Sequence, residues 1–355
     1  GRAGDIAGGA DLALSQTLRF LSDPAAYLPR PLRVEAIETH MSWVFLTDAF
    51  AYKLKKPVRY PFLDFSTLAA READCRDELR LNRRLAPGVY LGLTRLQRDR
   101  AGRLMLADEN GADATTGEPV DWLVRMRRLP AERTLEHLIR HHALQSFQID
   151  ALGRLLGSFY GHLPPADLDA DAHVAHLQAQ HALNLQALGA AADRLDGLEV
   201  RATLDGITRF LATGRALLGS RATDGRVVEG HGDLRPEHVF MLDPPVVIDC
   251  LEFSRELRLV DWADEIAFLG IECERLGAAW VGTTLRNSVS AALADPIADR
   301  LFDFHAALRA CLRARLALAH LDEAAPRTPE RWPRLAADYL RLAGRRVARL
   351  AAAAP

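Results

Sequence analysis

Residues 231–238, with the sequence His-Gly-Asp-Leu-Arg-Pro-Glu-His, are the part of the chain best suited to chemistry. Short apolar runs that favour strands flank this segment, and loops at strand ends commonly carry functional residues. Phosphoryl transfer needs an aspartate that orients and deprotonates the accepting hydroxyl, and a second acidic residue that holds the metal bridging the nucleotide phosphates. Asp233 in this loop and Asp249, which follows the apolar run 246–248, are candidates for these two roles.

Lysine is confined to one short window of the chain. Lys53, Lys55 and Lys56 are the only lysines, and arginine supplies the other 42 of the 45 basic residues. A mutational bias toward arginine that spared this window by chance is one explanation. The other, which we favour, is that a compact ammonium group fits between phosphate oxygens where a planar guanidinium does not. We expect the window to form a strand, in which alternation places Lys53 and Lys55 on one face.

These motifs together resemble a known superfamily. The 231–238 loop looks like the catalytic loop of kinases, in the His-Gly-Asp form typical of aminoglycoside phosphotransferases and choline-kinase-like enzymes. Ala51-Tyr52-Lys53 is similar to the Ala-x-Lys of the kinase strand whose lysine contacts the nucleotide phosphates. The resemblance covers residues 34–265, and it keeps the family order of strand lysine, helix glutamate, catalytic loop and metal aspartate.

The resemblance implies a catalytic role for three residues. Asp233 matches the catalytic base, and Asp249 matches the aspartate that binds the metal in these enzymes. Arg235 stands where related kinases place a lysine that neutralises the transferring phosphate. The cofactors implied are ATP and Mg²⁺ or Mn²⁺, and the partner implied is a small molecule that accepts the phosphoryl group on a hydroxyl.

The resemblance also implies a nucleotide-binding set in the first third of the chain. Lys53 would contact the phosphates, and Lys55 on the same strand face is a further cofactor-binding candidate. Glu78 is the expected partner of Lys53, because it shares the apolar stripe of its helix with Leu81 and Leu85, and Glu72 is the alternative.

Two positions depart from the family pattern. The fifth residue after the catalytic aspartate, an asparagine that binds metal in the family, is His238 here, and imidazole suits Mn²⁺ or Zn²⁺ better than Mg²⁺. The segment 37–44 lacks the glycine-rich sequence that covers the phosphates in protein kinases, which leaves Ser42, His40 and backbone amides as the expected contacts.

Further motifs at 39–42, 53–57 and 81–85 are similar to an uncharacterised bacterial branch of the aminoglycoside phosphotransferase superfamily. Some members of that branch carry a second, C-terminal P-loop kinase domain. The sequence Gly-x-x-x-x-Gly-Lys-[Ser/Thr] does not occur here, and the branch name does not identify aminoglycosides as substrates.

The elements that must position these residues fall into two groups. Strands are expected at 34–38, 43–47, 49–55, 91–96, 104–106 and 119–126, with a helix over 66–85 among them. After a change in composition near Arg127 the chain is mainly helical, apart from short strands at 226–228, 239–242 and 246–249. With the resemblance, this predicts an α+β, protein-kinase-like fold of two lobes. The N-lobe, 1–126, would hold a small antiparallel sheet, and the helical C-lobe, 127–355, would hold the catalytic loop 231–238 and the metal-binding strand end 246–252.

Composition and charge exclude several classes of protein. The chain has 355 residues, 49% of them hydrophobic and 26% charged, which is typical of globular proteins. A net charge of −2 predicts no binding to nucleic acid or to an anionic membrane. Four scattered cysteines, no signal-like start and no apolar run approaching about 18 residues favour a cytoplasmic protein that is neither secreted nor membrane-spanning.

Two functions stay open at this stage. The first is an ATP-dependent small-molecule kinase, which the retention of Lys53, Asp233 and Asp249 favours. The second is a pseudokinase, a nucleotide-binding regulatory module with weak or no phosphoryl transfer, which His238 favours. A protein kinase is less compatible, because no activation segment ending in Ala-Pro-Glu follows the metal aspartate.

Three smaller expectations concern the surroundings of the loop. Asp261 and Asp264 are candidates to brace it by accepting its backbone N–H groups, although plain helix N-terminal acids would look the same. Glu252 is equally compatible with an acidic contact to metal or substrate and with a solvated turn. The histidines at 173, 176 and 181 are expected to lie on a solvated helix face rather than to bind a metal.

Overall fold

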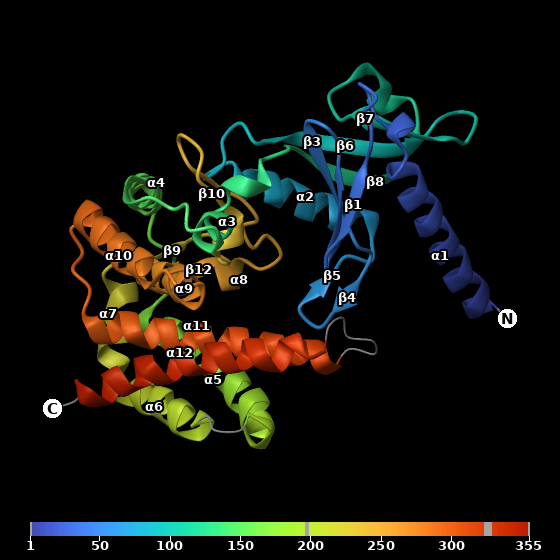
Figure 1. The fold of residues 1–355 in the computed structure, drawn as a ribbon. Coiled ribbons are helices and arrows are strands. Elements are labelled where there is room, and N and C mark those ends of the chain that lie inside the picture. The colour runs from blue at the N-terminus through green and yellow to red at the C-terminus, as the bar shows by residue number, and fades with distance from the viewer. Residues whose placement is uncertain (1, 196–198, 323–328, 354–355) are drawn as a thin grey trace. The chain divides into compact units, whose positions relative to one another are not determined.

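The computed structural model describes residues 2–195, 199–322 and 329–353, and the chain divides into two compact units (Figure 1). The N-terminal unit is Gly1–Pro130 with Val247–Phe253, and the C-terminal unit is Ala131–Val246 with Ser254–Pro355. The first division between these compact units follows Pro130, close to the lobe boundary predicted after residue 126, which stays a prediction. The N–H of Arg128 still donates to the carbonyl of Ala49, 2.9 Å away, which ties the end of the last strand to the sheet.

The N-terminal unit is built on one antiparallel sheet. Its strand order is β1, β2, β3, β8, β6, β7, and each neighbouring pair runs antiparallel. The strands are β1 (Glu35–Glu38), β2 (Ser42–Leu46), β3 (Phe50–Lys55), β6 (Tyr90–Arg98), β7 (Leu104–Asp108) and β8 (Glu118–Arg127), and β4 (Arg59–Tyr60) pairs with β5 (Leu63–Asp64) in a separate hairpin. The predicted sheet is confirmed, and a prediction of strands could not supply this order, because β8 inserts between β3 and β6.

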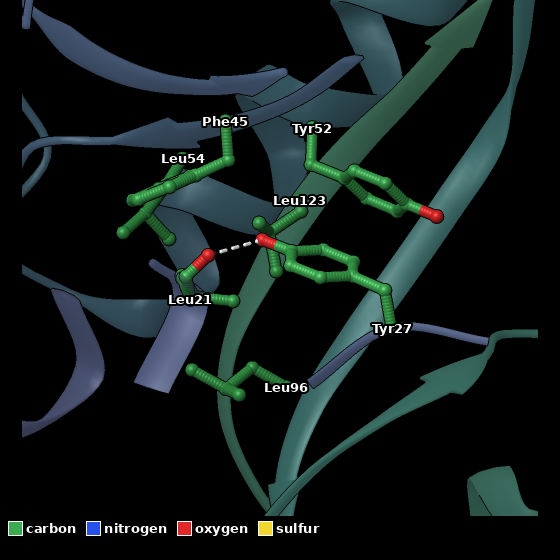
Figure 2. Close-up of a cluster of buried hydrophobic side chains, with 7 residues drawn as sticks. All are labelled: Leu21, Tyr27, Phe45, Tyr52, Leu54, Leu96 and Leu123. Atoms are coloured by element: carbon green, nitrogen blue, oxygen red, sulfur yellow. Dashed lines mark hydrogen bonds between the residues drawn. The ribbon is translucent and has the colours of Figure 1, made fainter. Parts of the chain in front are cut away.

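Alternation along β3 gives its two faces different chemistry. Tyr52 and Leu54 belong to a buried apolar cluster that also includes Leu21, Tyr27, Phe45, Leu96 and Leu123 (Figure 2). Leu21 ends helix α1 (Arg2–Leu21), and the Tyr27 hydroxyl donates to the Leu21 carbonyl, 2.6 Å away. Burying each of these side chains contributes about 1.5–3 kcal/mol, which holds β3 in place and leaves its lysine face for other contacts.

Helix α2 (Leu68–Asn82) packs against β8 and β6. Thr67 caps its start by accepting the N–H of Ala70, and the chain leaves the helix before Pro87 and Gly88. The helix lies within the predicted range 66–85. It carries buried polar residues, namely Arg71, Asp74, Glu78 and Asn82, so its inner face is not a purely apolar stripe.

The C-terminal unit is mainly helical, as the sequence predicts. Its helices are α3 (Leu135–Arg140), α4 (Ser146–His162), α5 (Ala170–Ala191), α6 (Val200–Thr213), α7 (Arg215–Thr223), α8 (Arg255–Arg258), α9 (Trp262–Arg275), α10 (Ala279–Leu293), α11 (Asp299–Ala319) and α12 (Arg331–Ala352). Helices α11 and α12 lie side by side, and α9 packs against both α10 and α11 (Figure 1). Nearly every residue of α9 from Trp262 to Cys273 is buried, so α9 is the centre of this unit.

Short strands frame the 231–238 loop within the C-terminal unit. β9 (Val227–Glu229) precedes the loop and pairs with β12 (Leu259–Asp261), a strand that the sequence analysis did not predict. β10 (Val239–Phe240) follows the loop and forms a second two-stranded sheet with β11 (Val246–Val247). None of the described helices is long and apolar enough to cross a bilayer.

Candidate functional site

Lys53 in β3 lies among carboxylates of the N-terminal unit. Its Nζ is 2.8 Å from Glu78 Oε1 and 3.6 Å from Asp249 Oδ1. Burial alone would lower the pKa of this ammonium, but the carboxylate of Glu78, with a further contribution from Asp249, raises the pKa above its usual value. The structure thus brings together three residues that the sequence analysis selected. Glu72, the alternative partner, instead accepts a hydrogen bond from Arg76.

Lys55 contacts three carboxylates and is closed to solvent. Its Nζ lies 2.6 Å from Glu78 Oε2, 2.9 Å from Asp74 Oδ2 and 2.7 Å from Glu252 Oε1, and its side chain is 1% exposed. Glu78 therefore uses one oxygen for each lysine. The two lysines predicted to bind the cofactor differ in this respect, because the side chain of Lys53 is 15% exposed.

Asp74 and Glu252 complete this cluster; the sequence analysis did not select Asp74 and left two alternatives for Glu252. Asp74 precedes Glu78 by one helical turn, a spacing that places both carboxylates on one face of α2. Burial raises the pKa of Asp74 to about 7, although Lys55 opposes the shift. Glu252 is not a solvated turn residue, because it pairs with Lys55, and a contact of Glu252 with metal or substrate stays a prediction.

Asp249 stands at a backbone position with positive φ. Its φ is +57°, in the left-handed region that aspartate tolerates better than most residues. Its backbone N–H donates to the Tyr90 hydroxyl, 3.2 Å away, and the next N–H, that of Cys250, donates to Asn82 Oδ1 at 2.9 Å. The side chain of Asp249 is 38% exposed, so this carboxylate is accessible to a ligand.

Ser42 begins β2 and is buried. Its hydroxyl oxygen lies 2.9 Å from Thr39 Oγ1, and Thr39 Oγ1 also donates to the Ser42 carbonyl at 3.0 Å. The predicted phosphate-covering segment therefore folds as a turn closed by its own side chains. Its hydroxyl groups bond to each other across this turn between β1 and β2.

In the C-terminal unit, Arg235 forms a two-pronged ion pair with Asp233. Arg235 Nε lies 2.9 Å from Asp233 Oδ1, and Arg235 Nη2 lies 3.2 Å from Asp233 Oδ2. Burial would raise the pKa of the Asp233 carboxyl, but the charges of Arg235 and His238 outweigh it and hold this pKa at about 2. Asp233 is therefore ionised at neutral pH, with its charge directed at the guanidinium.

His238 contacts the backbone of the loop. Its Nδ1 lies 2.9 Å from the carbonyl oxygen of Asp233, so this nitrogen carries the proton and donates. At the other end of the loop, His231 Nδ1 accepts the N–H of Asp233 at 3.1 Å. The Nδ1 atom of His238 is therefore used in a hydrogen bond to the loop backbone.

Glu265 in α9 supports the 231–238 loop by accepting hydrogen bonds from its backbone N–H groups. Its Oε1 accepts the N–H of His231 at 3.0 Å, and its Oε2 accepts the N–H of Gly232 at 2.8 Å. The Tyr160 hydroxyl donates to the same carboxylate at 2.7 Å. A Cβ at Gly230 would lie 2.7 Å from Glu265 Oε1, so the close approach of this carboxylate requires glycine there.

The carboxylate that braces the loop is thus Glu265, whereas Asp261 and Asp264 were expected. Asp261 caps α9 by accepting the N–H of Ala263 and binds Arg221, while Asp264 accepts from Arg309 Nε at 2.7 Å. One residue along a helix turns the side chain by about 100°, which decides whether it faces the loop. Tyr160, whose hydroxyl also holds Glu265, was not selected from the sequence.

The expectation of a solvated histidine face on α5 is wrong. His173 and His181 are 1% and 3% exposed, and His181 Nε2 lies 2.7 Å from Thr208 Oγ1. Burial lowers the pKa of both imidazoles, that of His173 to about 4. Over the described parts of the chain, no group of three or more His, Cys, Asp or Glu side chains is placed to hold a metal by itself.

No family model matches the sequence. An uncharacterised protein of Mycobacterium tuberculosis and one of Mycobacterium bovis are each 31% identical to the chain over 296 residues, which is 82% of this chain. The same alignment covers 56% of each relative, so the chain spans just over half the length of the curated relatives that it matches.

Two solved structures from kinase groups align with this structure at TM-scores just below 0.5. A mutant aminoglycoside 2'-phosphotransferase-IIIa in complex with GDP gives a TM-score of 0.48 at 15% identity, over 89% of this chain and 92% of that one. A choline/ethanolamine kinase family protein from Mesorhizobium loti gives 0.49 at 14% identity, over 95% and 94%. By these comparisons the chain is similar in sequence, over 82% of its length, to uncharacterised mycobacterial proteins.

Proposed function

We propose that the protein is an ATP-dependent phosphotransferase that acts on a hydroxyl group of a small molecule. The observation that carries this proposal is the placement of Lys53, with its ammonium 2.8 Å from Glu78 and 3.6 Å from Asp249. A lysine oriented by a buried glutamate next to an accessible carboxylate is the arrangement that nucleotide phosphates and their metal ion require.

The N-terminal unit supplies the nucleotide-binding half of this chemistry. Lys53 binds the phosphates, and Glu78 fixes the direction of its ammonium group. Asp249 fits Mg²⁺ or Mn²⁺, because it offers a hard, accessible carboxylate oxygen and because such ions are commonly held by one or two carboxylates plus substrate phosphates. When bound, the metal ion would neutralise charge on the phosphates. Lys55 is too enclosed to bind the nucleotide directly.

The C-terminal unit supplies the residues that act on the acceptor. Asp233 accepts a hydrogen bond from the acceptor hydroxyl and takes its proton, while the hydroxyl oxygen forms a bond to the γ-phosphorus. The bond from that phosphorus to the β–γ bridging oxygen breaks, and ADP leaves. Glu265 and His238 keep the loop backbone in place for this step through their contacts with His231, Gly232 and Asp233.

Arg235 must leave Asp233 before the aspartate can act. In the structure its guanidinium donates hydrogen bonds to both carboxylate oxygens of Asp233. The transferring phosphate carries more negative charge than a carboxylate, so it draws the guanidinium toward itself. That movement releases Asp233 and neutralises the phosphate at the same time.

A pseudokinase is the second candidate, and two observations favour it. His238 replaces the metal-binding asparagine of the family pattern, and the pKa of Asp233, about 2, is low for a general base. In this alternative the N-terminal unit binds nucleotide and the ion pair between Asp233 and Arg235 stays closed.

The experiment that separates the two functions is a screen of hydroxyl-bearing metabolites with labelled ATP, run in Mg²⁺ and in Mn²⁺. We expect label transfer to at least one acceptor, and we expect the Asp233→Asn variant to lose it while still binding ADP. Nucleotide binding without transfer to any acceptor in either metal would favour the pseudokinase. Absence of nucleotide binding in both metals would overturn both proposals.

A further inference from the structure

Contacts within the N-terminal unit hold the segment that begins with Asp249. The N–H of Asp249 donates to Tyr90, the N–H of Cys250 donates to Asn82, and the carboxylate of Glu252 pairs with Lys55 at 2.7 Å. Residues 247–253 belong to this unit although more than a hundred residues separate them from the rest of it in sequence. The segment is thus attached to the sheet and to α2 by side chains.

Asn82 connects the Asp249 segment to the turn of α2 that carries Glu78. Its Nδ2 donates to the Glu78 carbonyl at 2.8 Å, and its Oδ1 accepts the N–H of Cys250 at 2.9 Å. Asn82 is 1% exposed, so water cannot replace either bond. A residue without both a donor and an acceptor would leave buried backbone groups unsatisfied. Asn82 lies in the 81–85 motif, to which the proposed function assigns no role.

Lys55 makes a second connection between the same two elements. Its ammonium bridges Glu78 Oε2 and Glu252 Oε1, and Glu78 Oε1 bonds Lys53. One carboxylate therefore links the lysine proposed to bind phosphate to the lysine that holds the Asp249 segment. Because this network is buried, its ion pairs are weakly screened by solvent.

The backbone of Asp249 needs this support. A non-glycine residue at φ +57° is strained, and such a conformation persists where the surroundings hold it on both sides. Here the peptide N–H groups of Asp249 and of Cys250 are both bonded, and Glu252 anchors the chain three residues later. Loss of these contacts would let Asp249 relax to negative φ and would redirect its carboxylate.

We propose that Lys55 and Asn82 are positioning residues that hold Asp249 at the correct place relative to Lys53. The inference rests on the proposed function. In it, Lys55 holds the Asp249 segment in place and does not bind the nucleotide. It also implies that α2, with Glu78, and the Asp249 segment move as one body. The Lys53–Glu78 pair and the carboxylate of Asp249, the proposed metal ligand, then keep their positions relative to each other.

Amide hydrogen exchange tests the attachment without requiring activity. We expect exchange at Asp249 and Cys250 to be faster by about tenfold or more in Asn82→Leu and in Lys55→Met, because one support of the segment is lost. Lys56→Met is the matched control, since Lys56 pairs with Glu38 at 2.7 Å and does not contact the segment. Unchanged exchange in both test variants would overturn the proposal.

If a variant fails to fold, Glu252→Gln replaces it. This change preserves side-chain volume and an acceptor oxygen but removes the charge that pairs with Lys55. We expect a smaller increase in exchange at Cys250, of about threefold, with the rest of the sheet unaffected. Exchange equal to that of the wild type would contradict a holding role for the Lys55 pair.

Nucleotide binding separates positioning from a general structural role. ADP affinity is measured with Mn²⁺ and without metal. We expect Mn²⁺ to raise the ADP affinity of Asn82→Leu by a factor about tenfold smaller than in the wild type. Without metal, the ADP affinity of the variant should stay within about twofold of the wild-type value. An equal loss in both conditions, or no loss, would overturn the positioning role. A wild-type chain that bound no ADP would overturn the proposed function, and the exchange rates would then decide whether Lys55 and Asn82 hold Asp249.

Discussion

In the N-terminal unit, the ammonium groups of Lys53 and Lys55 lie among four carboxylates, those of Asp74, Glu78, Asp249 and Glu252. In the C-terminal unit, by contrast, the carboxylate of Asp233 lies against the guanidinium of Arg235 and the imidazole of His238. The first cluster has more acidic than basic groups, so it gains from an added cation. In the second, the guanidinium of Arg235 pairs with Asp233 and also lies 3.4 Å from a carboxylate oxygen of Glu237. A metal ion and a phosphoryl group are the charges that phosphoryl transfer would bring to these two clusters.

The same contrast appears in proton affinity. Burial raises the pKa of Asp74 to about 7, whereas the charges around Asp233 overcome burial and hold its pKa at about 2. Buried Asp74 and partly buried Asp233 thus behave in opposite ways. The difference shows that the surrounding charges, and not burial alone, decide which carboxylate is ionised at neutral pH.

The largest expected effect follows from Asp233→Asn. An amide cannot accept the acceptor proton, so phosphoryl transfer should fall by about 10²–10⁴-fold. ADP affinity should stay within about twofold, because the lost group acts on the acceptor and not on the nucleotide. Steady-state turnover and ADP titration measure the two quantities. Asp224→Asn, at an exposed position of the same unit, is the control. Turnover close to wild type in Asp233→Asn would remove the aspartate from the mechanism.

The Lys53→Arg variant tests whether the lysine cluster of the N-terminal unit binds ATP through Lys53. The longer, planar guanidinium cannot keep the contacts of Lys53 with Glu78 and Asp249, so ATP use should fall by at least about tenfold, which corresponds to one lost charge-assisted hydrogen bond. Lys56→Arg should have little effect, since Lys56 pairs with Glu38 instead. The measurement is kcat/KM for ATP in both variants. Equal losses would contradict the selection of Lys53.

The His238→Asn variant tests whether His238, near Asp233, is a ligand of the metal ion. The asparagine amide can donate to the Asp233 carbonyl as His238 Nδ1 does, so the loop should keep its shape. If His238 Nε2 is a metal ligand, the wild type should bind nucleotide more tightly in Mn²⁺ than in Mg²⁺. In His238→Asn the ratio of the affinity in Mn²⁺ to the affinity in Mg²⁺ should then be smaller by roughly threefold to tenfold. An unchanged ratio would leave His238 with its bond to the loop backbone as its only role in this proposal.

The smallest effect concerns stability and pH. The pKa of Asp74 is about 7 in the folded chain, above the value near 3.8 of a free side chain, so the folded state holds an extra proton between these values. Stability from this group is complete below about pH 4 and is lost as the pH rises through 7. Asp74→Asn cannot lose that proton.

The melting temperature of Asp74→Asn relative to wild type should therefore rise by about 2 °C or more between pH 5 and pH 8. Asp77→Asn, on the same helix, is the control, because Asp77 is exposed and pairs only at 3.8 Å with Arg80. A difference between Asp74→Asn and wild type that does not change with pH would show that Asp74 is ionised throughout. The contrast with Asp233 would then be lost.

Local sequence determined those features that depend on neighbouring residues. The period of two along a strand places Lys53 and Lys55 on one face and Tyr52 and Leu54 on the other, as Figure 2 shows for the apolar side. The change from alternating to helical patterns predicted a strand-rich region followed by a mainly helical region, and the family resemblance implied the antiparallel sheet. The spacing of Glu78 on its helix selected it over Glu72 as the partner of Lys53.

Tertiary structure decided which distant charges meet. Lys55 joins Glu252 across 197 residues, and no local pattern carries that information. Glu265 rather than Asp264 reaches the loop because one residue changes the direction of a helical side chain by about 100°. Residues 247–253 join the N-terminal unit because buried partners in that unit satisfy their backbone and side-chain polar groups. The sequence by itself thus determined the chemical groups and their local faces, while packing of the two elements that carry Glu78 and Asp249 decided their geometry.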